Sequence, residues 1–585
     1  MSTQPLELRK ELGGDNLGEY VANTWHTYNT NRLPQLNGWK ELRNYVFATD
    51  TTTTTNNKLP WKNKTTLPKL CQIRDNLHSN YISAIFPSDD WLKWEAHTPD
   101  AAKKDTVRAI EAYMSNKTRM GNFKQEIDKC VYDYIDYGNA FITVDYVKKE
   151  LINDNEDRIK NYVGPWFSRI SPIDIVFNPL APSFQESFKI IRRIKTIGAL
   201  KSEFRESAEL NKLEEILSKR KEILRKGKGF GLDTLFKEEA LSVDGFGSYY
   251  EYLQSGFIEV LHFYGDIYNQ DTEEYQTARH IIVLDRMFVL SNEAIPSYLG
   301  HPPIYHVGWR MRPDNIWAQG PLDNLVGMQY RMDHLENMKA DAMDIAVHPP
   351  LVIAGEVEDF EWGPNAEIHI DENGSVTELG KNTQWVITAN NDIAMLEQRM
   401  ELYAGAPREA MGFRSPGEKT MFEVQQLQNA SSRVFTEKTT NFEIELSEKA
   451  LNAALEISKR NLDEEDLVSV IDSELGVQDF IKINKNDITS NGVIRPVGAR
   501  HFTAQAQLVQ NLTTLSNTPI WQQIGPHVSS KKLAALVEET MRLSKYDLVT
   551  PYVAISEQQE QQALMNQASE DLEVQASVDT SPIGQ

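Results

Sequence analysis

The stretch from Gly320 to Arg460 constrains the fold more than any other part of this 585-residue chain. Its first part predicts a helix that begins at Gly320-Pro321, because proline is tolerated in a first turn, and ends before His348-Pro349-Pro350, because proline cannot continue a helix. Its apolar residues recur at spacings of three and four: Leu322, Leu325, Met328, Met332, Leu335, Met338, Ala342 and Ile345. This spacing predicts one apolar face along a helix of about 40 Å.

After the prolines the pattern changes to short strands. Residues 351–354 and 366–370, the turn Asp371-Glu372-Asn373-Gly374 and residues 375–377 predict a small β segment around a hairpin. Helical spacing returns near Asp392 and runs to Tyr403.

A polar loop and a very long helix complete the stretch. Residues 405–417 contain several prolines and glycines, which predicts a loop without regular structure. Thr420-Met421-Phe422-Glu423 has the Thr-x-x-Glu form of a capping box, and the helix that it begins can continue to Arg460, with a kink expected near Thr439-Thr440. A helix of this length is typical of an elongated or assembled architecture.

Elsewhere, hydrophobic periodicity predicts a mixture of helices and strands, and therefore an α+β fold. Helical spacing is found in several ranges: within 1–48 (including Leu6–Leu12), 67–86, 101–115, 122–137, 199–228, 501–515 and 529–544. Strands are predicted at 138–147, 164–170, 173–177, 257–264, 280–284, 287–290, 467–471 and 480–483. The threonine-rich Asp50–Asn57 reads as a linker.

Composition narrows the classes of function. The net charge of −23 argues against simple high-affinity binding to nucleic acid, which needs a basic surface. A basic run near Lys219-Arg220-Lys221 leaves two interpretations open, a DNA contact or a solvated face paired with the interleaved glutamates. Two cysteines exclude a disulfide framework or a Cys-rich zinc site. No apolar run is long enough to span a membrane, and the N-terminus lacks a secretory signal, so we expect a chain made and folded in the cytoplasm.

The sequence offers no catalytic constellation. The segment Gly412-Phe-Arg-Ser-Pro-Gly417-Glu418-Lys419-Thr420 approaches a phosphate-binding P-loop, but Glu418 separates the glycine from the lysine and a predicted helix precedes the loop instead of a strand. Neither a His-Glu-x-x-His motif nor a Gly-x-Ser-x-Gly elbow occurs, and Asp89-Asp90 reads as a surface turn. We therefore predict a protein that is not an enzyme and uses no cofactor or metal.

Several short motifs resemble the portal (head–tail connector) proteins of short-tailed double-stranded DNA bacteriophages. They are Pro303-Ile-Tyr-His-Val-Gly-Trp-Arg310, Asp314-Asn315-Ile-Trp-Ala-Gln-Gly-Pro321, Met328-Gln329, Asp333-His-Leu-Glu-Asn337 and Lys419-Thr-Met-Phe-Glu423. Each motif is weak by itself, and the resemblance depends on their order and spacing along the chain.

The resemblance implies a portal-type subunit with a defined series of parts. They are an α/β wing (1–315), a stem helix (316–348), a small β clip (349–386), a second stem helix (387–404), a tunnel loop (405–419), a long wing helix (420–460), the end of the wing with a helical crown (461–555), and a flexible tail (556–585). The tail is rich in Glu, Gln, Ser and Ala and has no aromatic residue, which independently predicts disorder or folding only on a partner.

The resemblance also implies functional residues. Arg408, Arg414 and Lys419 would be the DNA-facing cations of the tunnel loop, and the alternative is that they pair with Glu401, Glu409 and Glu418 within the ring. Phe360, Trp362 and Ile370 would be the clip's contacts with partner proteins, unless they pack between neighbouring subunits. The acidic excess has two explanations as well, general solubility or a channel wall that repels DNA phosphates.

The function that the resemblance implies is mechanical. We expect a homo-oligomeric ring, a dodecamer in the virion, at the portal vertex of the capsid. Double-stranded DNA would pass through its channel during packaging and ejection, and its protein partners would be terminase, a tail adaptor, and the major capsid and scaffolding proteins, with no membrane involved. Two other classes stay open: another structural virion protein of capsid or scaffold type, and a nucleotide-dependent DNA enzyme.

Overall fold

The computed structural model describes residues 6–8, 17–87, 91–99, 101, 103–152, 158–204, 209–226, 257–270, 273–295, 301–347, 351–354, 375–378, 384–404, 434–462, 466–471, 478–483, 485–489 and 491–496. The chain divides into two compact units, the first over 1–464 and 484–496 and the second over 465–483 and 497–585. Helices alternate with several separate sheets, which confirms the predicted α+β class.

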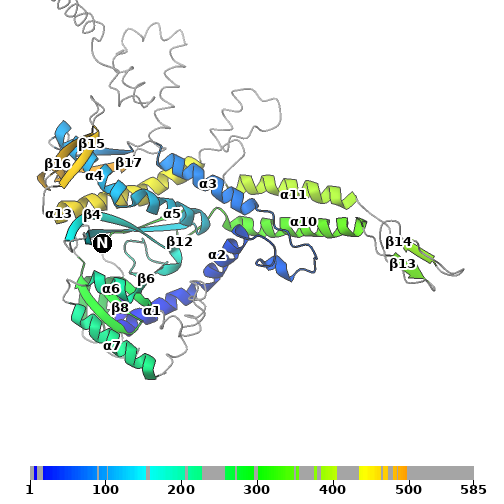
Figure 1. Ribbon diagram of the computed structural model, residues 1–585, viewed down its shortest axis with the longest axis horizontal. Coiled ribbons are helices and arrows are strands. Elements are labelled where there is room, and N and C mark those ends of the chain that lie inside the picture. Colours follow the sequence, from blue (N-terminus) through cyan, green and yellow to red (C-terminus); the bar gives the residue numbers. More distant parts are fainter. Residues whose placement is uncertain are drawn as a thin grey trace, which may run out of the picture. The chain divides into compact units, whose positions relative to one another are not determined.

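A six-stranded sheet is the largest in the first unit (Figure 1). Its strands β5 (Ile175–Phe177), β6 (Lys189–Thr196), β7 (Phe257–Asn269), β8 (Glu274–Leu284) and β9 (Phe288–Ala294) are neighbours in that order and antiparallel. β1 (Leu6–Leu8) lies parallel to β7. The helix predicted at Leu6–Leu12 is therefore wrong at its start, because pairing with β7 overrides the local spacing.

Both faces of this sheet are covered, which explains the nearly continuous apolar run in β7. On one face, α1 (Leu17–Asn31) contributes Val21 and Trp25 to a core with Phe263. On the other face, α6 (Ile197–Glu203) and α7 (Leu210–Lys226) pack against Val260 and Leu284. The single helix predicted over 199–228 is thus two helices. In α7, Lys219 pairs with Glu215 at 2.6 Å, the i,i+4 pairing expected of a solvated charged face.

A second sheet has the order β10 (Ile304–Gly308), β3 (Asn139–Ile152), β4 (Arg158–Ile170). The helices α5 (Phe123–Asp136) and α13 (Lys449–Asn461) pack on β3 and β4. A core of aromatic side chains joins the two sheets: Trp39, Phe141, Phe177, Phe184 and Trp317. Trp39 comes from α2 (Leu33–Val46), and Trp317 comes from β12 (Asn315–Gln319), which pairs with β11 (Arg310–Arg312).

The turn between α5 and β3 requires glycine. Gly138 has φ +68°, and a Cβ at this position would lie 2.3 Å from the backbone carbonyl carbon of Gln319. No other residue could make this turn without displacing the backbone of β12.

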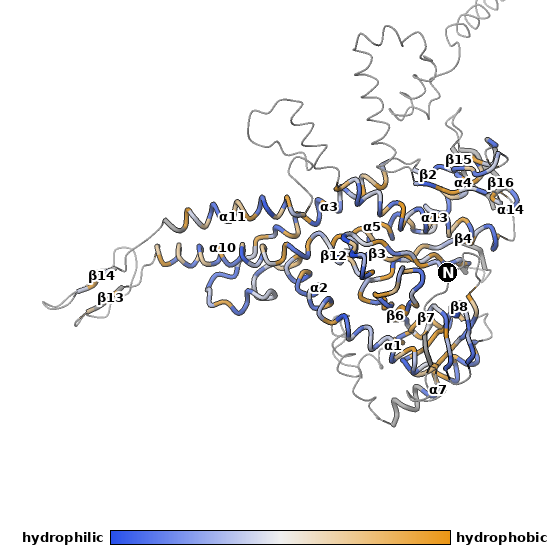
Figure 2. Tube along the Cα trace, turned by 180° about the vertical axis from the view of Figure 1, so that it is seen from behind, coloured by the Kyte–Doolittle hydropathy of each residue, from blue (hydrophilic) through white to orange (hydrophobic). Residues whose placement is uncertain are grey.

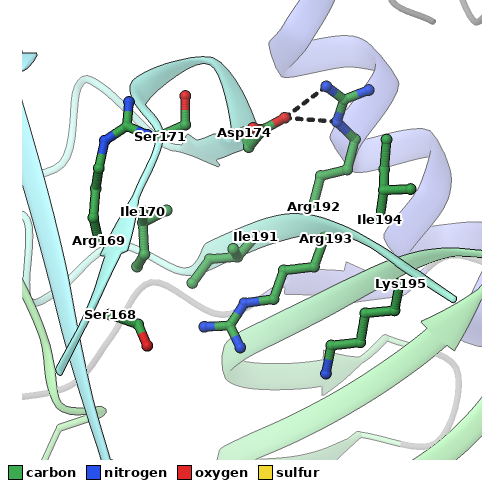
Figure 3. Close-up of a pocket in the computed structure, with 10 residues that line it drawn as sticks. All are labelled: Ser168, Arg169, Ile170, Ser171, Asp174, Ile191, Arg192, Arg193, Ile194 and Lys195. Carbon is green, nitrogen blue, oxygen red and sulfur yellow. Dashed lines mark hydrogen bonds and ion pairs between the residues drawn. The ribbon is translucent and has the colours of Figure 1, made fainter. Parts of the chain in front are cut away.

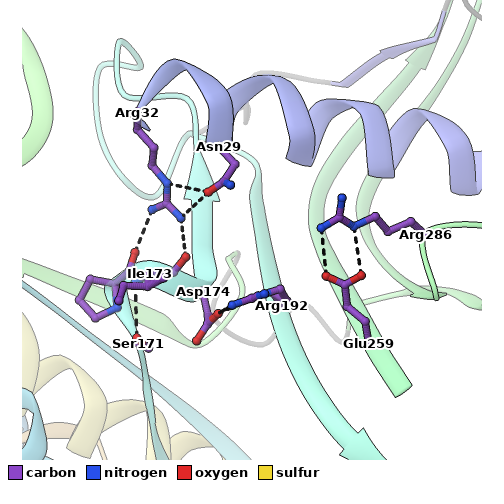
Figure 4. A network of polar contacts seen from close by, with 9 residues as sticks. Asn29, Arg32, Ser171, Ile173, Asp174, Arg192, Glu259 and Arg286 are labelled. Atoms are coloured by element: carbon purple, nitrogen blue, oxygen red, sulfur yellow. Dashed lines mark hydrogen bonds and ion pairs between the residues drawn. The ribbon is translucent and has the colours of Figure 1, made fainter. Parts of the chain in front are cut away.

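Polar contacts connect α1 to the segment between β4 and β5 (Figure 4). The buried Arg32 donates to the carbonyl oxygens of Pro172 at 2.8 Å and Ile173 at 2.5 Å, both in the 3-10 helix η4 (Pro172–Asp174). Arg192 donates to Asp174 at 2.6 Å, and Arg286 pairs with Glu259 at 3.0 Å. Burial lowers the pKa of Arg32 to about 9, yet two carbonyl acceptors satisfy its guanidinium.

The remaining elements of the first unit bring distant parts of the chain together. These are η2 (Thr55–Lys58), α3 (Lys69–Ile85), β2 (Leu92–Ala96), α4 (Lys104–Met120), η5 (Asp323–Leu325), α14 (Lys485–Ile488) and β17 (Gly492–Pro496). β17 pairs with β2 in antiparallel register, with Ile494 opposite Trp94. The side chain of Asn452 fixes this strand, since it accepts from the amide of Ile494 at 2.9 Å and donates to its carbonyl at 3.0 Å.

The long-helix region contains a π-helix. Helical residues from 434 lead into η6 (Glu443–Glu448), a π-helix, and then into α13. A π segment locally changes the winding of a helix, so the irregularity lies a few residues after the kink predicted at Thr439-Thr440. Residues 420–433 of the predicted helix lie outside the described residues.

In the second unit, the described residues form one antiparallel hairpin, β15 (Asp466–Ile471) with β16 (Gln478–Ile483). This confirms the two strands predicted there. The helices predicted over 501–544 and the tail from 556 lie outside the described residues. Among the helices that the structure does describe, none has both the length and the apolar composition of a membrane-spanning helix.

Candidate functional site

The six site residues predicted from the sequence all lie outside the described residues. They are Arg408, Arg414 and Lys419 of the tunnel loop, and Phe360, Trp362 and Ile370 of the clip. Their roles stay predictions, and the described elements that flank them in the sequence are two helices and two short strands. These elements are α10 (Val326–Val347), β13 (Leu351–Ala354), β14 (Ser375–Glu378) and α11 (Gln384–Tyr403), which together we call the helical hairpin.

The two helices of this hairpin lie side by side, and an antiparallel β13–β14 ribbon follows their connected ends (Figures 1 and 2). Lys339 on α10 donates to Asn390 on α11 at 3.1 Å. At the other end of α11, Glu401 accepts from Lys69 at 2.6 Å, and both side chains are only 7% exposed. This buried ion pair ties the end of α11 to the start of α3.

An extended segment, residues 59–68, runs along α10, and we call it the strap. Polar side chains spaced four apart on α10 bind its backbone: Asp333 accepts from the amide of Leu67 at 3.0 Å, Asn337 from that of Thr65 at 2.7 Å, and Asp341 from that of Asn63 at 2.9 Å. Four residues of helix rise about 6 Å and two residues of extended chain about 6.6 Å, so the two repeats match.

Further contacts fix the strap. Asn337 also donates to the carbonyl of Thr65 at 2.7 Å, Gln329 donates to that of Leu67 at 2.6 Å, and Trp61 donates to His334 at 3.0 Å. Asp333 carries a carboxyl group, yet it is completely buried under the strap. The i,i+4 series Gln329, Asp333, Asn337, Asp341 was the signal that could have indicated a bound backbone segment.

α11 carries apolar side chains on two opposite sides, and on the exposed side Asn391 and Gln398 lie among them. Ala389, Ile393 and Met400 are buried, and they are separated by four and seven residues, as on one face of a helix. Ile387, Met395 and Leu402 lie on the opposite side at a similar spacing and are 66%, 46% and 64% exposed. A helix that is apolar on both sides normally has neighbours on both sides.

The exposed apolar side chains concentrate on the hairpin. More than half of the large hydrophobic side chains that are exposed among the described residues belong to it, although it is a small part of them. They are Tyr330, Met343, Ile345, Val347, Val352, Ile387, Met395, Leu402 and Tyr403. A concentration of this kind is typical of surfaces that bind another protein.

No part of the structure that is described offers a metal centre, since it contains no group of three His, Cys, Asp or Glu side chains able to hold an ion. The exposed apolar side chains of the hairpin could pack against a protein surface. In comparisons with known proteins, no family model matches the sequence, and the search of curated proteins gave no significant match.

Proposed function

We propose that this chain is the subunit of a phage portal ring, which forms the channel for DNA packaging and ejection at one capsid vertex. The observation that carries the proposal is the second apolar face of α11, Ile387, Met395 and Leu402, within a hairpin of two long helices ending in a β ribbon. The order of wing, stem helix, β segment and second stem helix that the resemblance implies supports the same assignment.

A ring follows from the chemistry of the exposed face. Burying one large apolar side chain stabilises an interface by roughly 1.5–3 kcal/mol, so a handful of them can hold two subunits together. In the ring that we propose, this face of α11 would contact a different surface of the next copy, so the contact would be head-to-tail. Head-to-tail contacts of this type close into rings when the rotation between copies allows it.

The work of such a ring is to hold and guide DNA without covalent chemistry. By resemblance, terminase and the tail adaptor would bind the clip, the major capsid and scaffolding proteins would surround the wing, and the tunnel loop with Arg408, Arg414 and Lys419 would meet the duplex. In the virion, twelve copies would form the ring.

The test is the oligomeric state of three chains, measured by light scattering after gel filtration and by negative-stain imaging. We expect the wild type to form closed rings with a central hole as wide as a DNA duplex. The double variant Ile387→Asp/Leu402→Asp should remain monomeric with an unchanged circular dichroism spectrum. Leu180→Asp, at a position 73% exposed in the turn after β5, should form rings like the wild type.

Two results would contradict the proposal. Rings formed by the double variant would show that this face of α11 is not the interface. A wild-type chain that stays monomeric and hydrolyses ATP would instead favour the nucleotide-dependent enzyme.

A further inference from the structure

A cavity of about 520 Å³ lies between the end of β4 and the outer part of β6 (Figure 3). Ser168–Ser171 and Asp174 form one side of it, and Ile191–Lys195 form the other. It is formed by the wing region of the first unit, and no site predicted from the sequence includes it. Its volume falls in the range of sites that bind small organic molecules, roughly 300–1,000 Å³.

Four cationic side chains and one carboxylate line the cavity. Three of them have carboxylate partners: Arg169 with Asp133 at 2.5 Å, Arg192 with Asp174 at 2.6 Å, and Lys195 with Glu203 at 2.5 Å. Asp133 and Glu203 are not among the lining residues, so they neutralise these cations from outside the cavity.

The fourth cation, Arg193, is different. Within the described part of the chain it has neither a hydrogen bond nor an ion pair, although its side chain is half-buried. Asp145 on β3 interacts with it electrostatically without pairing, and burial raises the pKa of that carboxyl. A guanidinium has five N–H donors, and leaving them without acceptors in a partly buried place costs free energy that a bound anion would recover.

The surroundings of Arg193 offer additional donors. Successive residues of a strand point to opposite faces, and Figure 3 shows Arg193 and Lys195 extending together, away from Arg192 and on the same side as the hydroxyl of Ser168. β5 pairs with β6 only as far as Ile191, and among the described strands none continues the pairing along 193–196 on that edge.

We propose that this cavity binds the phosphate group of a nucleotide-sized phosphate ester. The Arg193 guanidinium would donate two parallel hydrogen bonds to phosphate oxygens, a geometry that guanidinium fits better than ammonium, and Lys195 and Ser168 would add further contacts. Because the cavity is much larger than one phosphate ion, the apolar side chains of Ile170, Ile191 and Ile194 would contact the organic part. The site is independent of ring formation and would exist in a single subunit.

The experiment is isothermal titration of the full-length chain with inorganic phosphate, AMP and a twelve-nucleotide single strand, at constant ionic strength set with chloride. We expect AMP to bind more tightly than inorganic phosphate. Arg193→Met should weaken binding of AMP about tenfold or more, Arg193→Lys should weaken it less, and the exposed Arg312→Met should bind like the wild type. Equal melting temperatures of the variants without ligand would show that they are folded.

The other probes identify the source of the phosphate. Tight binding of the single strand, lost in Arg193→Met, would assign the cavity to nucleic acid, and binding of AMP alone would assign it to a free nucleotide. The proposal is overturned if none of the three ligands binds, or if Arg193→Met binds AMP as tightly as the wild type.

Discussion

At the scale of single residues, Asp333 has the least ordinary environment in the helical hairpin. One of its oxygens accepts from the amide of Leu67 and from Gln329 at 2.8 Å. Its other oxygen, and the side-chain oxygen of Gln329, have no hydrogen-bond partner in the part of the chain that is described. Burial raises the pKa of Asp333 to about 7, only partly opposed by these two hydrogen bonds. A proton on this carboxyl would supply the donor that the site lacks.

Asp333 should therefore make stability depend on pH. Its pKa is higher in the folded chain than in the unfolded one, so its contribution is fully present below pH ~4 and is lost as pH rises through about 7. Between pH 5 and pH 8 we expect the wild type to lose free energy of unfolding on the order of 2 kcal/mol relative to Asp333→Asn. The melting temperature of the wild type should fall relative to that of the variant over the same range. The exposed Asp314→Asn serves as the control, and a pH-independent difference for Asp333→Asn would contradict the assignment.

At the scale of elements, the strap is the feature that the sequence described least well. The threonine-rich segment before the strap was predicted to be a linker. The strap itself is hydrogen-bonded to a helix more than 250 residues away in the sequence. Local pattern predicted α10 because its apolar face is regular. It could not predict what binds the polar face, because that depends on which distant backbone has unpaired amides.

The central contact of the strap is Asn337, whose amide group binds both the N–H and the carbonyl of Thr65 at 2.7 Å. Asn337→Leu should leave both backbone groups unpaired and destabilise the strap by about 2–4 kcal/mol. Hydrogen exchange measured by mass spectrometry should then show faster exchange over 59–68, with the sheets of the first unit unchanged. Arg331→Leu, an exposed change on the same helix, should leave exchange in the strap as it is.

Other elements were predictable to different degrees, for physical reasons. Strands with a run of apolar residues, such as 257–264 and 280–284, were found because they are buried on both faces. β1 was missed because three residues carry too little periodicity to compete with a helical reading. The site residues predicted from the sequence lie outside the described residues: Arg408, Arg414, Lys419, Phe360, Trp362 and Ile370. The basic cavity lies between β4 and β6 and has no local sequence signature.

At the scale of the whole molecule, net charge and exposed apolar surface have opposite effects on association between copies of the chain. A net charge of −23 makes copies of the chain repel one another, while the exposed faces of the hairpin favour association. Salt screens repulsion between exposed charges and leaves apolar contacts intact.

Ring formation should therefore increase with ionic strength. We expect the fraction of assembled chain, measured by analytical ultracentrifugation, to rise as sodium chloride is increased from about 50 to about 500 mM, where the screening length falls below ~10 Å. Rings that dissociate over this range would show that ion pairs between subunits, rather than the apolar face of α11, hold the assembly together.

The pairing of β2 with β17 also affects the order in which the chain can fold during synthesis. β2 leaves the ribosome early, but its partner strand is translated several hundred residues later. Until then the edge of β2 stays open, and the close approach of Gly492 to Trp94, where a Cβ would lie 2.4 Å from the indole, is not made. Contacts so far apart in sequence form slowly and late. A nascent chain thus completes its first unit only after residue 496 has been translated, and a product of earlier termination would keep an unpaired strand that quality control can recognise.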